Sequence, residues 1–153
     1  MLVNTTMTEL AADVQPRRKA GPMADYTIVR VADVADQAAE VGQDPDLFEI
    51  RFMRESLALQ NFSVTFEVMR DGCRGYGHRH TVQEEVVFLV SGRAQVKFGD
   101  EVIDLEPLTA VRVPPETARG FRAVGEEDAV FVIIAAPQAE LDDAVIIEDY
   151  WAD

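Results

Sequence analysis

The chain contains two histidines, and they stand one residue apart at His78 and His80. On a β-strand, side chains at positions i and i+2 point to the same face, so a strand here presents two imidazole rings side by side. Imidazole nitrogens are ligands of zinc, iron, nickel and other transition metals. The spacing therefore predicts two neighbouring metal ligands.

A carboxylate follows closely. Glu85 opens the strand-like run Glu85–Val90, and residues 81–84 must form a tight connection before it. Adjacent side chains on a strand face opposite ways, so Glu85 can point inward while Glu84 meets solvent. Two neutral imidazoles and one carboxylate form the facial set of non-haem iron and related divalent sites. The competing interpretation is that both histidines are polar side chains on an exposed strand face.

Short runs rich in β-branched and apolar residues recur along the chain, separated by Gly, Pro, Asp or Glu. Many short strands with regular turns predict an all-β sandwich or barrel. The predicted strands are Leu47–Arg54, Phe62–Met69, Tyr76–His80, Glu85–Val90, Ala94–Phe98, Val102–Leu105, Ala110–Val113, Arg119–Val124 and Ala129–Ala135. The predicted core or cavity wall comprises Phe62, Phe66, Val87, Phe88, Leu89, Phe98 and Val113.

The two ends of the chain differ from this middle part. Residues 1–24 have no hydrophobic period and are interpreted as a flexible tail, which leaves 25–153 as a single domain. Within that domain, Tyr26–Val31 predicts a strand and Ala32–Val41 a short helix. The ending Asp142–Trp151 alternates acidic and apolar residues, and we expect it to pack on the barrel exterior or on a second subunit.

Composition excludes several classes of partner. The formal net charge is -14, with 28 acidic and 14 basic residues, and such a surface repels nucleic acid and anionic lipid. No run of 18 or more apolar residues predicts a membrane span. The single cysteine, Cys73, cannot form an internal disulfide, which favours a cytoplasmic protein. We expect a small molecule as the ligand.

The stretch Gly72–Gly92 resembles the first motif of the cupin superfamily, G-x5-H-x-H-x4-E-x6-G, at every fixed position. The resemblance is to small, single-domain cupins of the conserved-barrel type, and it implies a jelly-roll barrel, also described as a double-stranded β-helix. It also implies that His78, His80 and Glu85 bind a divalent metal such as Fe, Mn, Ni or Zn, with no organic cofactor. Family members often form homodimers.

The second cupin motif is poorly matched. Only Pro114 is kept, and Arg119 stands where the family has its fourth ligand, a histidine. Arginine stays protonated and does not ligate metals. Three outcomes follow: Arg119 pairs with Glu85 in a metal-free barrel; a metal binds through the other three residues with Arg119 turned away or bridged by an anion; or Arg119 grips an anionic ligand without a metal.

Together these features predict a metal or ligand site inside a barrel. If the chain is an enzyme, an oxygenase, isomerase or lyase acting on a small anionic molecule would suit it, with Arg119 and Tyr76 contacting the substrate. The alternative is a metal-free binding module in which Arg119 pairs with Glu85 or with an anionic ligand.

Overall fold

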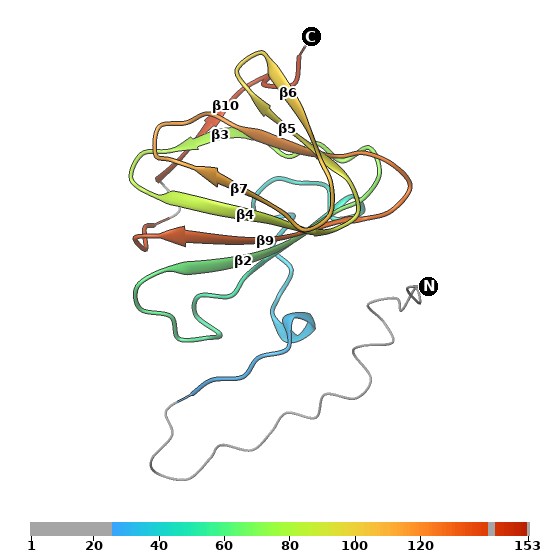
Figure 1. The fold of residues 1–153 in the computed structure, drawn as a ribbon. Coiled ribbons are helices and arrows are strands. Elements are labelled where there is room, and N and C mark those ends of the chain that lie inside the picture. Colours follow the sequence, from blue (N-terminus) through green and yellow to red (C-terminus); the bar gives the residue numbers. More distant parts are fainter. Residues whose placement is uncertain (1–25, 141–142, 153) are drawn as a thin grey trace.

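The computed structural model describes residues 26–140 and 143–152, so the predicted tail 1–24 lies outside the described part of the chain. The described residues are almost entirely β-structure (Figure 1). The strands are β1 (Phe48–Phe52), β2 (Ser63–Met69), β3 (Gly77–His80), β4 (Glu84–Ser91), β5 (Ala94–Phe98), β6 (Glu101–Leu105), β7 (Thr109–Val113), β8 (Gly120–Ala123), β9 (Ala129–Ala136) and β10 (Ala144–Ile147).

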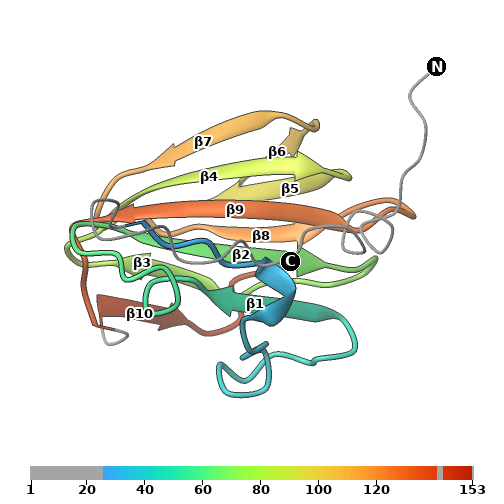
Figure 2. The same ribbon diagram turned by 90° about the horizontal axis from the view of Figure 1, so that it is seen from below.

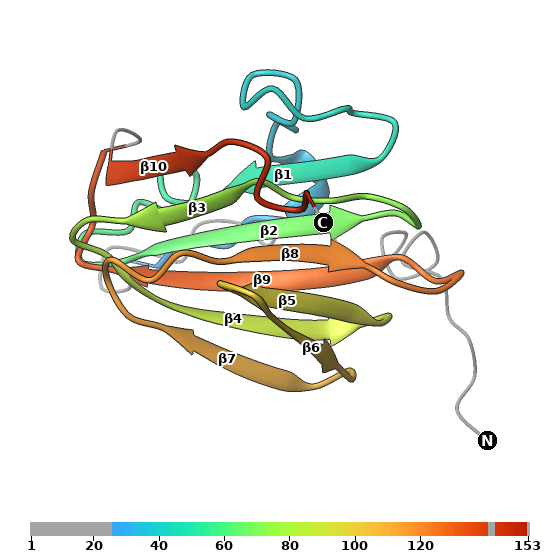
Figure 3. The ribbon, with the colours of Figure 1, turned by 90° about the horizontal axis from the view of Figure 1, so that it is seen from above.

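Two antiparallel layers form the barrel. The first is a five-stranded sheet in the order β1-β2-β9-β4-β7, which Figure 2 shows side by side. The second consists of the sheet β6-β5-β8 and the pair β10-β3, linked by a backbone bridge between His78 and Arg119. Figure 3 shows β10, β3, β8, β5 and β6 following one another in this layer. The all-β jelly-roll prediction is confirmed.

Apolar side chains from both layers meet in the interior. Leu89 and Phe131 from the five-stranded sheet are each 1% exposed, as is Val96 from the facing layer. The rings of Phe131 and Phe121 meet edge to face with centroids 5.6 Å apart, and this pair joins the two layers. Burial of such side chains is the main favourable contribution to folding.

Strand β2 turns the apolar side chains of Val64 and Phe66 away from the interior, which the sequence does not suggest. Glu67 lies opposite Ile50 on β1 and Phe131 on β9, both buried, so Glu67 faces the interior with them. Phe66, one residue away, therefore faces out. Strand β4 places Phe88 on the same outer face, 39% exposed, so the prediction of Phe88 as a core residue is wrong.

The nine strands predicted from Leu47 to Ala135 are present, but the beginning of the domain differs from expectation. Tyr26–Val31 is extended and unpaired up to the 3₁₀ turn Val31–Asp33, so the predicted strand there is wrong. That turn is the short N-terminal helix, in place of a longer one over Ala32–Val41. The segment after this turn is instead hydrogen-bonded to β1. The amide of Gln37 donates to the carbonyl of Ile50 at 2.9 Å.

The C-terminal segment adds a strand, β10, to the edge of β3. Beyond it, aromatic side chains lie on glycines of the barrel wall. A Cβ atom at Gly77 would come within 2.0 Å of Tyr150, and the indole nitrogen of Trp151 donates to the carbonyl of Gly75 at 3.0 Å. Because a side chain at Gly77 would displace Tyr150, glycine at this position allows the close approach.

Candidate metal site

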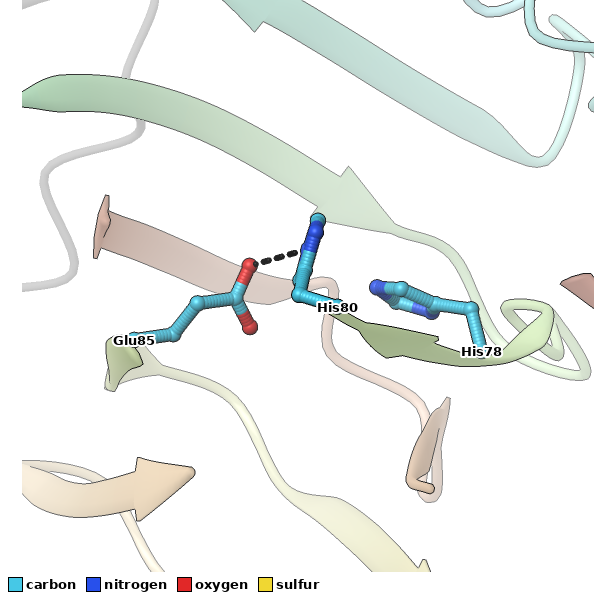
Figure 4. Close-up of side chains that lie close together, drawn as sticks. All are labelled: His78, His80 and Glu85. Carbon is cyan, nitrogen blue, oxygen red and sulfur yellow. Dashed lines mark ion pairs between the residues drawn. The ribbon is translucent and has the colours of Figure 1, made fainter. Parts of the chain in front are cut away.

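His78, His80 and Glu85 converge between the two layers of the barrel. The two imidazoles come from β3 and the carboxylate from the start of β4, with Glu85 facing His80 in Figure 4. Their potential ligand atoms all lie within 4.8 Å of one another. The three residues that the spacing predicted as a site are therefore brought together.

Strand pairing explains why Glu85 points inward. It lies between Val113 on β7 and Ala135 on β9, which are 1% and 7% exposed, and Glu85 itself is 8% exposed. Glu84, on the opposite face, is exposed and forms an ion pair with Arg112. The division of this Glu-Glu pair between interior and solvent follows from strand alternation.

His80 lies between two carboxylates. Its Nε2 is 2.9 Å from Oε1 of Glu85, and its Nδ1 is 3.1 Å from Oδ2 of Asp143. Cis ligands of a metal with bonds of about 2.1 Å lie about 3 Å apart, so the first distance suits two ligands of one cation. The ring of His80 is thus fixed at both nitrogens.

His78 provides a neutral imidazole. Its ring lies 5.2 Å from that of His80, centroid to centroid, at an interplanar angle of 86°. Burial, and then the nearby charge of Arg119, lower the pKa of His78 to about 4. At neutral pH the ring therefore keeps an unprotonated nitrogen, as metal binding requires.

Arg119 points into the barrel and contacts Glu85. The backbones of Arg119 and His78 exchange hydrogen bonds of 2.9 and 3.0 Å, which places the two side chains side by side on the inner face. The guanidinium is 1% exposed; Nη2 donates to Oε2 of Glu85, and Nη1 donates to the carbonyl of His78 at 3.2 Å. Although burial opposes ionisation, the hydrogen bond from His80 and the charge of Arg119 hold the pKa of Glu85 below its usual value.

Comparison with known proteins agrees with the fold. Residues 65–135 match the cupin domain family. An uncharacterized protein of Streptomyces coelicolor is 31% identical over 90 residues, which cover 59% of this chain and 81% of that protein. A cupin protein from Bacteroides fragilis shares the fold with a TM-score of 0.61 and 20% identity, over 82% of this chain and 99% of that one.

The chain belongs to the cupin family. It is also 35% identical over 72 residues to a protein named polyketide synthase CurC from Streptomyces cyaneus. That match spans 47% of each chain, so this cupin covers about half the length of that relative. In the described part of this cupin, no helix is long and apolar enough to cross a membrane.

The residues present fit a divalent cation. Two imidazoles and a carboxylate supply three donor atoms of a set that suits first-row transition metals. Arg119 occupies only Oε2 of Glu85 and leaves Oε1 facing His80. The ligand atoms of the three residues lie up to 4.8 Å apart. To bind one cation, the ring of His78 would have to move closer to His80 and Glu85.

Glu67 is a second inward carboxyl that the sequence reasoning missed. Burial, and then the charge of Glu85, raise its pKa to about 8, while Arg119 opposes the rise. Glu67 is therefore protonated at neutral pH and does not add a second negative charge beside Glu85. The alternation along β2 hides it, because Val64, Phe66 and Val68 suggest the opposite face as the buried one.

Tyr76, the other predicted ligand-contacting residue, does not join the cluster through its hydroxyl. That hydroxyl donates to the carbonyl of Val41, beside Gly42. The backbone carbonyl of Tyr76 instead lies 3.4 Å from Nδ1 of His78. Contact between the phenol and a bound ligand would require the bond to Val41 to break.

Two hollows in the described part of the chain lie elsewhere on the surface. One of about 600 Å³ runs along the C-terminal segment from Ile146 to Ala152, and one of about 310 Å³ lies beside Arg74 and Arg122. Neither is lined by His78, His80 or Glu85.

Proposed function

We propose that this cupin binds a divalent cation, such as Fe, Mn, Ni or Zn, inside its barrel through His78, His80 and Glu85. The observation that supports this most directly is the convergence of their ligand atoms within 4.8 Å. A cation held there would supply Lewis-acid chemistry by polarising an oxygen of a bound molecule. Three protein ligands leave positions free for that molecule.

The ligand we propose is small and anionic or rich in oxygen. Arg119 supports this, because its buried Nε is among the described side-chain nitrogens that lack a hydrogen-bond partner. A guanidinium with a free donor suits a carboxylate or enolate oxygen. The relative named polyketide synthase fits an oxygen-rich ligand. An oxygenase, an isomerase and a lyase are each compatible with this donor set. Arg119 would contact the substrate, and Tyr76 would do so once the bond from its hydroxyl to Val41 breaks.

One observation favours a second function, a metal-free binding module. Both oxygens of Glu85 already have partners, since Oε2 accepts from Arg119 and Oε1 lies 2.9 Å from Nε2 of His80. A buried carboxylate satisfied in this way needs no cation. In that case the free Nε of Arg119 would bind an anionic effector.

Metal analysis of protein purified without a polyhistidine tag separates these two functions. The metal site predicts about one Fe, Mn, Ni or Zn per chain, lost in the double variant His78→Ala/His80→Ala. Glu84→Gln, which alters the exposed neighbour of Glu85, is the matched control and keeps the metal. Absence of metal after reconstitution with each of the four ions contradicts the metal site and supports the binding module.

We propose in addition that the protein is a cytoplasmic homodimer that associates through the outer face of its five-stranded sheet. Six apolar side chains form two cross-strand rows there, which we name the outer apolar patch: Val64, Ile134 and Val86 in one row, Phe66, Val132 and Phe88 in the other. Exposed apolar patches of this kind usually mark protein interfaces.

Charge supports a second copy of this chain as the occupant of the outer apolar patch. The chain carries a net charge of -14, which opposes association through most surfaces. Around this patch the charges are balanced, because Glu49 pairs with Arg51 and Arg70 on one side and Glu84 pairs with Arg112 on the other. Two such faces can therefore meet without repulsion between unpaired acidic groups.

A further inference from the structure

We propose that Asp143 is a positioning residue of the site. It holds the hydrogen of His80 on Nδ1, so that Nε2 is free to bind a cation. The inference rests on the proposed metal function and extends it to a residue that neither the cupin motif nor the comparisons assign.

The contacts of Asp143 centre on one loop. Its Oδ2 lies 3.1 Å from Nδ1 of His80 and accepts the amide of Gln83 at 3.2 Å. Its Oδ1 accepts the amides of Val82 at 2.9 Å and Thr81 at 3.2 Å, together with the hydroxyl of Thr81. The side chain is 5% exposed. Burial alone would raise the pKa of Asp143, but these hydrogen bonds lower it.

That loop joins two of the candidate ligands. Residues 81–83 connect His80 at the end of β3 to β4, on which Glu85 lies. A single carboxylate that binds three consecutive amides therefore fixes the path of the chain between an imidazole ligand and a carboxylate ligand. Ligand geometry depends on such supporting hydrogen bonds.

Strand β10 brings Asp143 to this place from 60 residues away in the chain. Ala144 pairs with His80, and Ile146 pairs with His78. The residue just before β10 thus lies beside the loop that follows β3. This pairing makes the C-terminal strand part of the site rather than a separate outer element.

The contact between Asp143 and His80 determines which ring nitrogen of His80 carries the hydrogen. A neutral ring has one N–H donor and one acceptor nitrogen, and an ionised carboxylate only accepts. A hydrogen bond to Asp143 therefore places a hydrogen on Nδ1. A cation that replaces the hydrogen on Nε2 would lie between that nitrogen and Oε1 of Glu85.

The state of the ring can be read directly by nitrogen NMR. Because the chain has two histidines, ¹⁵N spectra of the metal-free full chain resolve both rings, and the variant His78→Gln assigns them. Wild type should show His80 with hydrogen on Nδ1. In Asp143→Asn the amide group donates to Nδ1, so the hydrogen should move to Nε2.

Affinity for Co²⁺, measured by titration, gives a second readout. Loss of a carboxylate that orients a metal-ligating histidine typically lowers affinity about 10–100-fold, and we expect this for Asp143→Asn. Thr81→Val is the matched control. It removes one donor to the same carboxylate and keeps the contact of that carboxylate with His80, so it should lower the affinity less than Asp143→Asn does and leave the hydrogen on Nδ1.

The two readouts separate failure of this inference from failure of the metal site. Wild-type His80 with hydrogen on Nε2 alone overturns the role of Asp143, even if Asp143→Asn does not fold. Equal loss of affinity in Thr81→Val and Asp143→Asn also overturns it, because loop order alone would then explain the effect. A wild-type chain with hydrogen on Nδ1 that binds no Co²⁺ supports the role of Asp143 and contradicts the metal function instead.

Discussion

Each face of the five-stranded sheet departs in part from the pattern that a half-buried sheet usually shows. Toward the interior, the sheet presents the carboxyl groups of Glu67 and Glu85 among its apolar side chains. On the outside, the outer apolar patch spans β2, β9 and β4. Antiparallel sheets usually place apolar side chains inward and polar ones toward solvent.

The contrast shows where each face obtains its stability. Interior polar groups are stabilised by one another, since Arg119, Glu85 and His80 form a continuous chain of contacts. In the outer apolar patch, Phe88 and Ile134 are 39% and 38% exposed, and we infer that another copy covers them. Removing a charge on the inner face should therefore lower folding stability. Adding a charge on the outer face should weaken the dimer.

Breaking the inner ion pair should have the largest effect. Arg119→Leu leaves Glu85 buried without its cation, and we expect the free energy of unfolding to fall by about 3–5 kcal/mol, measured by chemical denaturation. Arg119→Leu/Glu85→Leu removes both charges and should recover most of the loss. A loss below about 1 kcal/mol in the single variant would place the pair in a solvated setting.

A charge introduced on the outer face should weaken the proposed dimer. Phe88→Glu puts a carboxylate into one row of the outer apolar patch and should weaken the dimer at least about tenfold, as measured by analytical ultracentrifugation. Val102→Glu, at another exposed apolar position, 43% exposed on β6 of the facing layer, should leave the dimer intact. A monomeric wild type, or equal effects of both changes, contradicts the proposed interface.

Much of this arrangement could be predicted from the sequence. The strands follow from short apolar runs between turn residues, and the cluster of His78, His80 and Glu85 follows from spacing alone. The inner position of Glu67 could not be predicted, because alternation along β2 gives the same pattern whether its apolar face meets the core or another subunit. Asp143 contacts His80 from 63 positions away, and no local pattern reveals such a contact.

The protonated state of Glu67 should make stability depend on pH. Its pKa rises from 4.5 in the unfolded chain to about 8 in the fold, so the folded state binds more protons between these values. Stability from this group is present at low pH and is lost as pH rises toward about 8. In thermal melts of metal-free protein, the melting temperature of Glu67→Gln relative to wild type should therefore rise with pH across this range. If the difference in melting temperature between Glu67→Gln and wild type does not change with pH, Glu67 does not lie in the interior.

His78 should produce a smaller effect of opposite direction. Its pKa falls from 6.5 in the unfolded chain to about 4 in the fold, a smaller displacement than that of Glu67. The unfolded state binds more protons in this window, so stability falls as pH drops from 6.5 toward about 4. His78→Gln should lose less stability than wild type over the same range in acid melts. Parallel curves for the two proteins would show that His78 is solvated.

The most direct test of the central claim is an anomalous difference map from crystals of the full chain grown with Co²⁺. The account predicts one strong peak between the layers of the barrel, about 2.0–2.2 Å from a nitrogen of His78, Nε2 of His80 and Oε1 of Glu85. A map without a peak at these atoms, with Arg119 and His80 still bound to Glu85, would contradict it.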